Sequence, residues 1–352
     1  MEKYVSDKIR MISFFLILLV LYIHSGFHTE EIQGMKVNFY VQMILGDMIG
    51  RCAVPMFYVI SGFLFFLSTT INIESIFIKM QKRFKSLVIP YIIGCVFVVL
   101  FLYILLQIQG ISHFINGNIS LIFKKDMLTL LYNTFVNSGS GTPIAFHLWF
   151  LRDLILLVFL APLWFFLYKW FNWFWVGLIG LLAIYLSEGS FAYSLFWFSL
   201  GGAIHLIKFN IEETTTSLNK KVTIFLFILL CLLELFTFKW HGWYFLKVPI
   251  IFLGLLAIWF AYDFVFSKHF RIKNYRYLFY ITSCTFFIYL FHMPTLNIVR
   301  KLIVYFLGKN SIGFLISYIL SPWLFVGCVT IISLFFKKYF FNFYKIIVGG
   351  RV

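Results

Sequence analysis

The chain has 352 residues, of which 62% are hydrophobic and only 12% are charged. Its mean hydropathy of +0.94 is too high for a soluble domain, because one core of this size cannot bury so much apolar surface. Composition therefore excludes a soluble enzyme and indicates an integral membrane protein. The net charge of +16 is attributed to membrane topology and to attraction toward anionic lipid, since no nucleic-acid-binding motif accompanies it.

Ten apolar segments are long enough, or nearly so, to cross ~30 Å of hydrocarbon as helices. They are residues 10–27, 46–68, 87–107, 146–168, 172–187, 191–207, 222–239, 245–265, 279–299 and 312–336. The alternating segments of a membrane β-barrel are absent from the sequence. The sequence therefore predicts an all-α, polytopic membrane protein with about ten transmembrane helices, forming a single domain over residues 1–352.

Lys and Arg residues set the predicted orientation. With the N-terminus inside, more than twice as many of them fall in inner segments as in outer ones, and this bias is typical of cytoplasmic loops. Both termini are therefore predicted to be cytoplasmic. The first segment resembles a signal peptide without a cleavage site and is interpreted as an uncleaved helix. The five cysteines are scattered through apolar runs, which argues against a disulfide framework and a metal site.

The longest outer connection, residues 108–145, is predicted to contain a helix from Ile119 to Val136. A Gly- and Ser-rich stretch from Asn137 to Pro143 follows it. Such a composition is typical of a mobile linker. The linker leads directly into His147.

The most informative segment is residues 51–62, which places Arg51, Pro55 and the Ser61-Gly62 pair in an apolar run. A charge at bilayer depth costs several kcal/mol, so an intramembrane arginine indicates a functional site. In the predicted topology, further polar groups lie at the same outer depth, as a cavity open to the outside requires. The set is His24, Asp47, Arg51, His147, Trp149, Arg152, Asp153, Glu234 and His292.

Each of these residues also has a structural interpretation. A lone membrane histidine is often a packing group, and Arg152 with Asp153 could pair with other helices. Glu234 could be a buried hydrogen-bonding group, and Trp149 could be an interfacial anchor. The functional hypothesis therefore depends on the set rather than on one residue.

A second polar level lies on the inner side. Arg10 shares a helix face with His24, about 21 Å away at a rise of ~1.5 Å per residue. Lys79, Lys82, Arg83 and Lys85 precede the third predicted helix. Such a cluster suits a phosphate-rich cytosolic donor, although clusters of this kind also serve only as topology anchors.

Four motifs together resemble the membrane acyltransferase-3 family. They are Ile23-His24-Ser25, the run from Arg51 to Phe65, the run from His147 to Asp153, and the run from Leu290 to Pro294. Their order and spacing match over almost the whole chain. The resemblance implies about ten transmembrane helices and transfer of an acyl group, commonly acetyl, from cytosolic acyl-CoA to a hydroxyl of an envelope glycan or its lipid-linked precursor.

The resemblance also implies roles for single residues. His24 matches the catalytic histidine of the first helix, Arg51 and Ser61 match the second-helix motif, Trp149 the fourth-helix motif and His292 the ninth-helix motif. One departure concerns the first-helix arginine of the family, whose place is taken by Ser13. Arg10, one turn lower on the same face, is the candidate substitute. The basic pair expected before the third helix is matched only loosely by Lys82, Arg83 and Lys85.

The chemistry follows from the weak nucleophilicity of a hydroxyl at neutral pH. A neutral imidazole can act as general base, and His24 is the candidate. Arg51 or Arg152 could stabilise the oxyanion or position the acceptor, and Glu234 or Asp153 could orient the imidazole. Ser61, His147, Trp149, Asp153 and His292 are candidates for the acceptor site or for structural roles. The sequence contains no Gly-x-Ser-x-Gly elbow, the motif that would indicate a covalent acyl-enzyme.

The sequence thus predicts a multi-pass O-acyltransferase of a bacterial-type inner membrane, with O-acetyl transfer as the expected reaction. Its partners would be acyl-CoA as donor substrate, a cell-surface polysaccharide or lipid-linked saccharide as acceptor, and the bilayer, without a tightly bound cofactor, metal or nucleic acid. An exporter or flippase of a polysaccharide intermediate is the alternative, because an outer polar cavity suits either function. A sensor or scaffold would leave the buried ionisable residues without a role.

Overall fold

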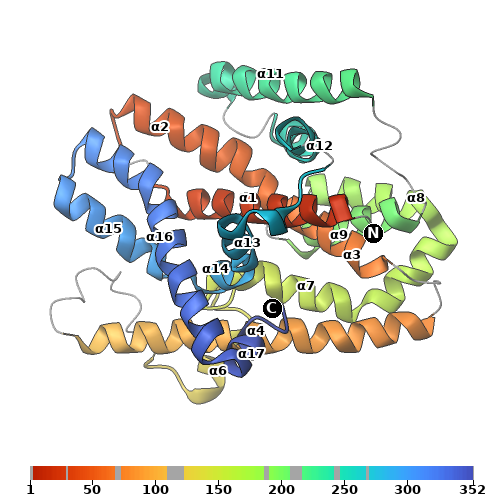
Figure 1. The fold of residues 1–352 in the computed structure, drawn as a ribbon, viewed down its shortest axis with the longest axis horizontal. Coiled ribbons are helices and arrows are strands. Elements are labelled where there is room, and N and C mark those ends of the chain that lie inside the picture. Colours follow the sequence, from red (N-terminus) through yellow and green to blue (C-terminus); the bar gives the residue numbers. More distant parts are fainter. Residues whose placement is uncertain are drawn as a thin grey trace.

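The computed structural model describes residues 3–28, 31–67, 73–108, 123–185, 190–206, 216–241, 246–266 and 269–351. Within these residues the regular structure is entirely helical (Figure 1), which confirms the predicted all-α class. The α-helices are α1 (Lys3–Ser25), α2 (Lys36–Gln42), α3 (Ala53–Phe66), α4 (Ile73–Gln107), α6 (Met127–Phe135), α7 (Trp149–Phe159), α8 (Ala161–Tyr185), α9 (Phe191–Leu206), α11 (Ser217–His241), α12 (Lys247–Val265), α13 (Arg276–Ser283), α14 (Thr285–Phe291), α15 (Thr295–Leu307), α16 (Ser311–Tyr339) and α17 (Phe341–Ile347). A π-helix η1 (Met43–Ile49) and three 3-10 helices, η2 (Gly50–Cys52), η4 (Phe146–Leu148) and η5 (Ile272–Asn274), complete the set.

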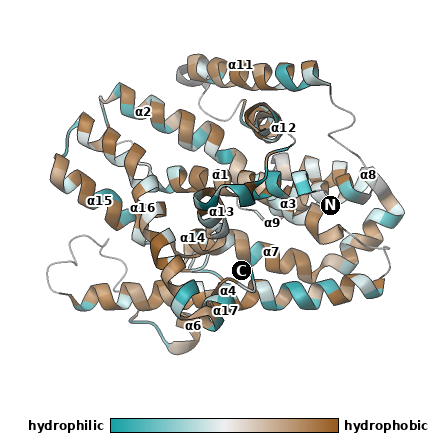
Figure 2. Ribbon diagram, viewed as in Figure 1, coloured by the Kyte–Doolittle hydropathy of each residue, from teal (hydrophilic) through white to brown (hydrophobic). Residues whose placement is uncertain are grey.

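Hydrophobic residues run along most of these helices (Figure 2), and each predicted apolar segment is helical over most of its described residues. By length and composition, five of the described helices could cross a membrane. If each of two bent helix pairs also counts as one span, the number of candidate spans rises to seven. The chain is therefore a polytopic membrane protein.

Two predicted spans are sharply bent. The fourth breaks at Leu160, where Phe146–Phe159 and Ala161–Phe171 meet at 64°. Pro162 lies in the first turn of α8, a position where its missing N–H removes no helical bond. The ninth breaks at His292 to Pro294, with 76° between Thr285–Phe291 and Thr295–Leu307. The second bend places a candidate site residue in a helix break rather than along a helix.

Helix α1 lies in the middle of the bundle (Figure 1) and contacts helices from both halves of the chain. All six residues from Leu16 to Leu21 are buried. A helix that is hydrophobic all round is stable only when neighbours cover every face, so α1 is the central helix.

The two ends of α1 are held by polar contacts. Near its start, the Asp263 carboxylate accepts hydrogen bonds from Tyr4, Lys8 and Lys220, each at 2.6 Å. Lys8 is fully buried, and its charge is stabilised by this ion pair and by the Trp259 ring at 4.3 Å. The contact fastens α11 and α12 to α1.

At the other end, Arg300 of α15 donates to the backbone carbonyls of Ser25 and Gly26. The last carbonyls of a helix have no partner within the helix, and a cation there is also favoured by the helix dipole. Arg300 therefore holds the turn of α1 that carries His24. Sequence analysis did not single out Arg300, since no local motif indicates this contact.

Helices α3 and α9 approach each other most closely at two glycines. A Cβ atom on Gly62 would lie 2.0 Å from the Phe198 carbonyl oxygen, and one on Gly201 would lie 2.0 Å from the Val59 oxygen. Small residues at such crossings allow helix backbones to pack closely in lipid. The Ser61-Gly62 pair of the second-helix motif thus brings α3 against α9.

We expect Gly62→Ala and Gly201→Ala each to destabilise the protein by about 1–3 kcal/mol, because the added methyl group overlaps a backbone oxygen. Thermal unfolding of the purified protein in detergent measures the effect. The matched control is Gly327→Ala in α16, where a Cβ meets nothing within 4 Å. Equal melting temperatures for all three variants would contradict this account of the crossing.

Candidate active site

His24 lies in the last turn of α1 and is partly exposed. Its ring centroid is 5.1 Å from that of His292 and 5.5 Å from that of Phe146. The ring of His147 lies 4.6 Å from His292. Three histidines that are far apart in the sequence therefore meet, which their shared predicted depth allowed but did not establish.

Backbone carbonyls determine which nitrogen of two of these rings carries hydrogen. His292 Nδ1 lies 2.6 Å from the Tyr289 oxygen, and His147 Nε2 lies 3.3 Å from the Leu290 oxygen. Because a carbonyl only accepts hydrogen bonds, both of these nitrogens donate. In the neutral rings, His292 Nε2 and His147 Nδ1 are then acceptors, and both are buried without a hydrogen-bond partner among the described residues.

The described residues contain no group of three or more His, Cys, Asp or Glu arranged to hold a metal ion, and this includes the three histidines. Two of the rings direct a nitrogen at a carbonyl rather than at a common centre. Acid–base chemistry is therefore the property to consider at this cluster.

A first cavity, with a volume of about 360 Å³, runs beside α1 from the Arg10 level to His24. Its wall is largely apolar, with Leu87, Phe65 and Leu154 among the lining residues. Three arginines line it, namely Arg10, Arg83 and Arg351, and the described lining residues include no carboxylate. Ser13, Ser61 and His147 also line this cavity.

A second cavity, of about 470 Å³, lies against the loop that follows α6. Its lining is more polar and includes Arg51 and the hydroxyl-bearing residues Ser140, Thr142, Ser190 and Tyr193. Four residues, Val20, His24, Val54 and Trp149, line both cavities. His24 and Trp149 therefore stand at the boundary between them.

Arg51 is placed beside His24 by η2, which begins directly after the π-helix. Its Nη2 lies 3.3 Å from Asp47 Oδ1, and the Arg51 side chain is 38% exposed. An ion pair this exposed contributes little to stability. Arg51 lines the second cavity beside this weak ion pair.

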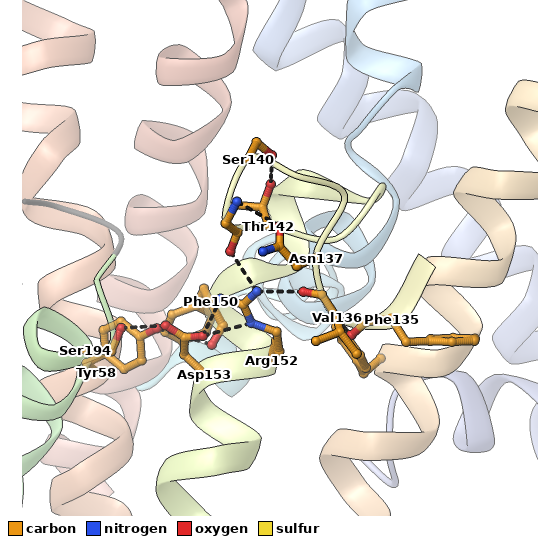
Figure 3. Close-up of polar contacts among 12 residues, drawn as sticks. Tyr58, Phe135, Val136, Asn137, Ser140, Thr142, Phe150, Arg152, Asp153 and Ser194 are labelled. Carbon is orange, nitrogen blue, oxygen red and sulfur yellow. Dashed lines mark hydrogen bonds and ion pairs between the residues drawn. The ribbon is translucent and has the colours of Figure 1, made fainter. Parts of the chain in front are cut away.

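Arg152 and Asp153 lie together on α7 (Figure 3). Arg152 donates to Asp153 Oδ1 at 2.9 and 3.0 Å and to the carbonyls of Val136 and Gly141, each at 2.8 Å. Asp153 Oδ2 accepts a hydrogen bond from Ser194 at 3.0 Å. The pair therefore joins α9, α7 and the loop after α6, and both carboxylate oxygens are occupied.

The loop predicted to be a mobile linker is folded by its own hydrogen bonds. The Asn137 side chain accepts from the amides of Gly139 and Gly141, and the Ser138 amide donates to the Thr142 carbonyl. Together with Arg152, these contacts shape one wall of the second cavity.

Some predicted site residues lie elsewhere. Glu234 is fully buried on α11 and is absent from the described lining of both cavities. Lys82 and Lys85 are exposed and line a separate surface depression with Phe159, whereas Arg83 is half-buried and faces the first cavity. Helical geometry explains the difference, because neighbouring residues point about 100° apart.

Sequence analysis missed the placement of Arg351, Tyr289 and Arg300. Arg351 belongs to none of the four motifs, and Tyr289 precedes one of them without carrying a charge. No sequence signal distinguished them, because their positions depend on how separate helices pack.

We expect Arg152→Ala to loosen the loop of residues 137–143, because it removes both hydrogen bonds to the loop carbonyls and leaves the buried Asp153 charge unpaired. Removing one partner of a buried pair costs about 3–5 kcal/mol. Limited proteolysis of the loop and thermal unfolding measure the two effects. The double variant Arg152→Ala with Asp153→Asn is expected to regain part of the stability, because the unpaired charge is gone, but its loop should still be cleaved. Lys169→Ala, at an exposed position on α8, is the control. Unchanged cleavage in Arg152→Ala would contradict this role.

Comparison with known proteins agrees with this geometry. No curated protein and no solved structure matches the chain significantly. Residues 9–337 match an acyltransferase domain, that of the acyltransferase-3 family. The match covers all four motifs and the helices that line both cavities. The chain therefore belongs to the acyltransferase-3 family and is a membrane acyltransferase.

Proposed function

We propose that the protein transfers an acyl group, most simply acetyl, from cytosolic acyl-CoA to a hydroxyl of a cell-surface polysaccharide or lipid-linked saccharide. The observation that supports this best is the position of His24, which lines both cavities. A donor in the first cavity and an acceptor in the second would meet at this imidazole.

The first cavity suits an acyl-CoA donor. Three arginines line it, and one of them, Arg10, is about 21 Å from His24 along the continuous helix α1, at ~1.5 Å per residue. An extended pantetheine arm spans a distance of this order. We assign the phosphates to Arg10 and Arg83, because guanidinium groups bind phosphate oxygens in pairs. Lys82 and Lys85, which are exposed, would contribute only long-range attraction.

The second cavity suits a saccharide acceptor. Hydroxyl groups of Ser140, Thr142, Ser190 and Tyr193 can donate to and accept from sugar hydroxyls. Arg51 and Trp149 also line this cavity, as does His24. A few placed polar groups are what fix the orientation of a small ligand in a pocket.

The reaction requires two proton transfers, one from the acceptor hydroxyl and one to the CoA thiolate. Neutral His24 removes the proton of the acceptor hydroxyl while that oxygen attacks the thioester carbonyl. A tetrahedral oxyanion forms, and Arg51 is the cation placed to stabilise it. The C–S bond then breaks, the ester remains on the acceptor, and the CoA thiolate receives the proton from His24.

His292 is the best candidate to orient His24. Asp153 has both oxygens occupied by Arg152 and Ser194, and Glu234 lines neither cavity among the described residues. His292 Nδ1 donates to the Tyr289 carbonyl, so the acceptor nitrogen of the neutral His292 ring is Nε2. This ring lies next to His24. An acceptor there can hold an N–H of His24, which leaves the other His24 nitrogen as the base. We assign Ser61 and His147 to the wall of the donor cavity, and Arg152 to positioning of the acceptor loop.

The proposal includes a topology with about ten spans and both termini cytoplasmic, in a bacterial-type inner membrane. It places the first cavity toward cytosolic acyl-CoA and the loop at Ser140 outside. The Lys and Arg bias supports this orientation. Export or flipping of a saccharide intermediate is the other function considered, but membership of an acyltransferase family favours group transfer.

His24→Ala is expected to lower acyl transfer by about 10²- to 10⁴-fold, the usual contribution of a general base, while the amount of folded protein stays the same. Mass analysis of the surface glycan from a strain carrying the variant measures the product. His269→Ala, at an exposed position outside both cavities, is the matched control. Normal acylation by His24→Ala would refute the mechanism.

Cysteine labelling tests the orientation. In a background without native cysteines, Ser140→Cys should react with an impermeant maleimide in intact cells. Lys273→Cys, in η5, should react only after permeabilisation, because the Lys-rich inner loops face the cytoplasm. The opposite pattern would place His24 on the wrong side for an external acceptor.

A further inference from the structure

The segment after α17 brings a third arginine to the first cavity. Residues 348–351 follow α17 and lie outside the part of the chain matched to the family, which ends at residue 337. Arg351 nevertheless lines the same cavity as Arg10 and Arg83. Its guanidinium lies over the Phe286 ring at 4.0 Å and donates to the carbonyls of Ser86 and Val348 at 2.8 and 3.0 Å.

Glycine geometry allows this close approach. Gly349 and Gly350 have φ angles of 62° and 82°, a region that other residues rarely adopt. A Cβ on Gly349 would lie 2.2 Å from the Ser86 carbonyl oxygen. Helix α17 itself is fixed by Tyr344, which hydrogen-bonds Ser333 of α16 at 3.1 Å and stacks on Phe287. The segment is therefore held against α4 by specific contacts.

Three arginines line this cavity and its described lining contains no carboxylate, although the Asp7 charge acts on Arg10 from outside the lining. Arg83 makes no side-chain hydrogen bond or ion pair with the described residues. Arg10 uses Nε and Nη2 on Thr282 and the Phe279 carbonyl, and Arg351 uses Nη1, so each retains free N–H groups. Burial and the nearby Arg83 charge lower the pKa of Arg351 to about 10, which leaves it protonated at neutral pH. On the same side of the molecule, Asp263 is occupied by Tyr4, Lys8 and Lys220.

Like charges gathered in a half-buried site repel each other, and a bound polyanion relieves this repulsion. Guanidinium groups match phosphate oxygens in pairs. We propose that Arg351, carried by the Gly349-Gly350 segment, is a donor-binding residue that completes a three-arginine site for the phosphates of acyl-CoA. This inference rests on the proposed function, which supplies the donor.

The test compares two donors that differ in the phosphates. Acetyl-CoA and S-acetylpantetheine share the thioester arm, but only acetyl-CoA carries the nucleotide phosphates. Calorimetry with the full-length protein in nanodiscs measures both affinities. Arg351→Gln should weaken acetyl-CoA binding by roughly 10- to 100-fold, the contribution of a charge-assisted hydrogen bond, and leave S-acetylpantetheine unchanged. Arg351→Lys should fall between wild type and Arg351→Gln.

Lys345→Gln is the matched control, because it removes one positive charge from α17 at an exposed position outside the described cavity lining. Equal weakening of both donors by Arg351→Gln would indicate a purely structural role and overturn the inference. An unchanged affinity for acetyl-CoA in Arg351→Gln would also overturn the inference, but it would not contradict the proposed function. If wild-type protein binds no acetyl-CoA, both the inference and the proposed donor fail.

A lipid headgroup is the other source of phosphate, and lipid composition distinguishes it. The titrations are repeated in nanodiscs of phosphatidylcholine alone and with phosphatidylglycerol. A donor site predicts the same Arg351→Gln effect on acetyl-CoA in both. An effect confined to nanodiscs with anionic lipid would assign Arg351 to a headgroup and overturn the proposal.

Discussion

Burial of the middle of α1, from Leu16 to Leu21, is the constraint on which the rest of the structure depends. Lipid supplies no hydrophobic force between helices, so close packing and polar contacts must hold a central helix in place. Residues Leu16–Leu21 are covered by neighbours, Asp263 binds side chains near the start of α1, and Arg300 holds the carbonyls at its end. His24 lies in the turn just before that second contact. The position of the imidazole is therefore set by how α1 is held rather than by its own hydrogen bonds.

The boundary between two cavities explains how one side chain could serve substrates from opposite sides of a membrane. The first cavity is largely apolar and is lined by three arginines, and the second is lined by hydroxyl groups and Arg51. His24 and Trp149 separate them. Neither substrate would need to cross the bilayer if the acyl group alone passes this boundary. The arrangement also keeps the charged parts of a donor away from the hydrocarbon, where an uncompensated charge is costly.

The second cavity depends on a loop that the fold stabilises through α7. Arg152 donates hydrogen bonds to Asp153 and to two loop carbonyls. Ser194 donates to the other oxygen of the Asp153 carboxylate. A buried ion pair of this kind contributes to geometry more than to stability, because desolvation offsets much of the attraction. Both residues belong to a recognised motif. In this structure they shape the wall of the site, whereas Arg51 and His24 line it.

The sequence by itself determined the membrane class, the helical segments and, through its four motifs, the family. Run length settles the first two, because the bilayer limits a spanning segment to a helix of about 20 residues. The common depth of the site residues stays a prediction. Packing decided which residues at one depth meet. Glu234 and His292 have similar predicted depths, yet Glu234 lies on α11 and His292 lies beside His24 in a helix break. Arg83 lines a cavity and Lys82 does not, since helical rotation separates neighbours. Arg351 reaches the same cavity only through contacts between distant helices, for which no local pattern exists.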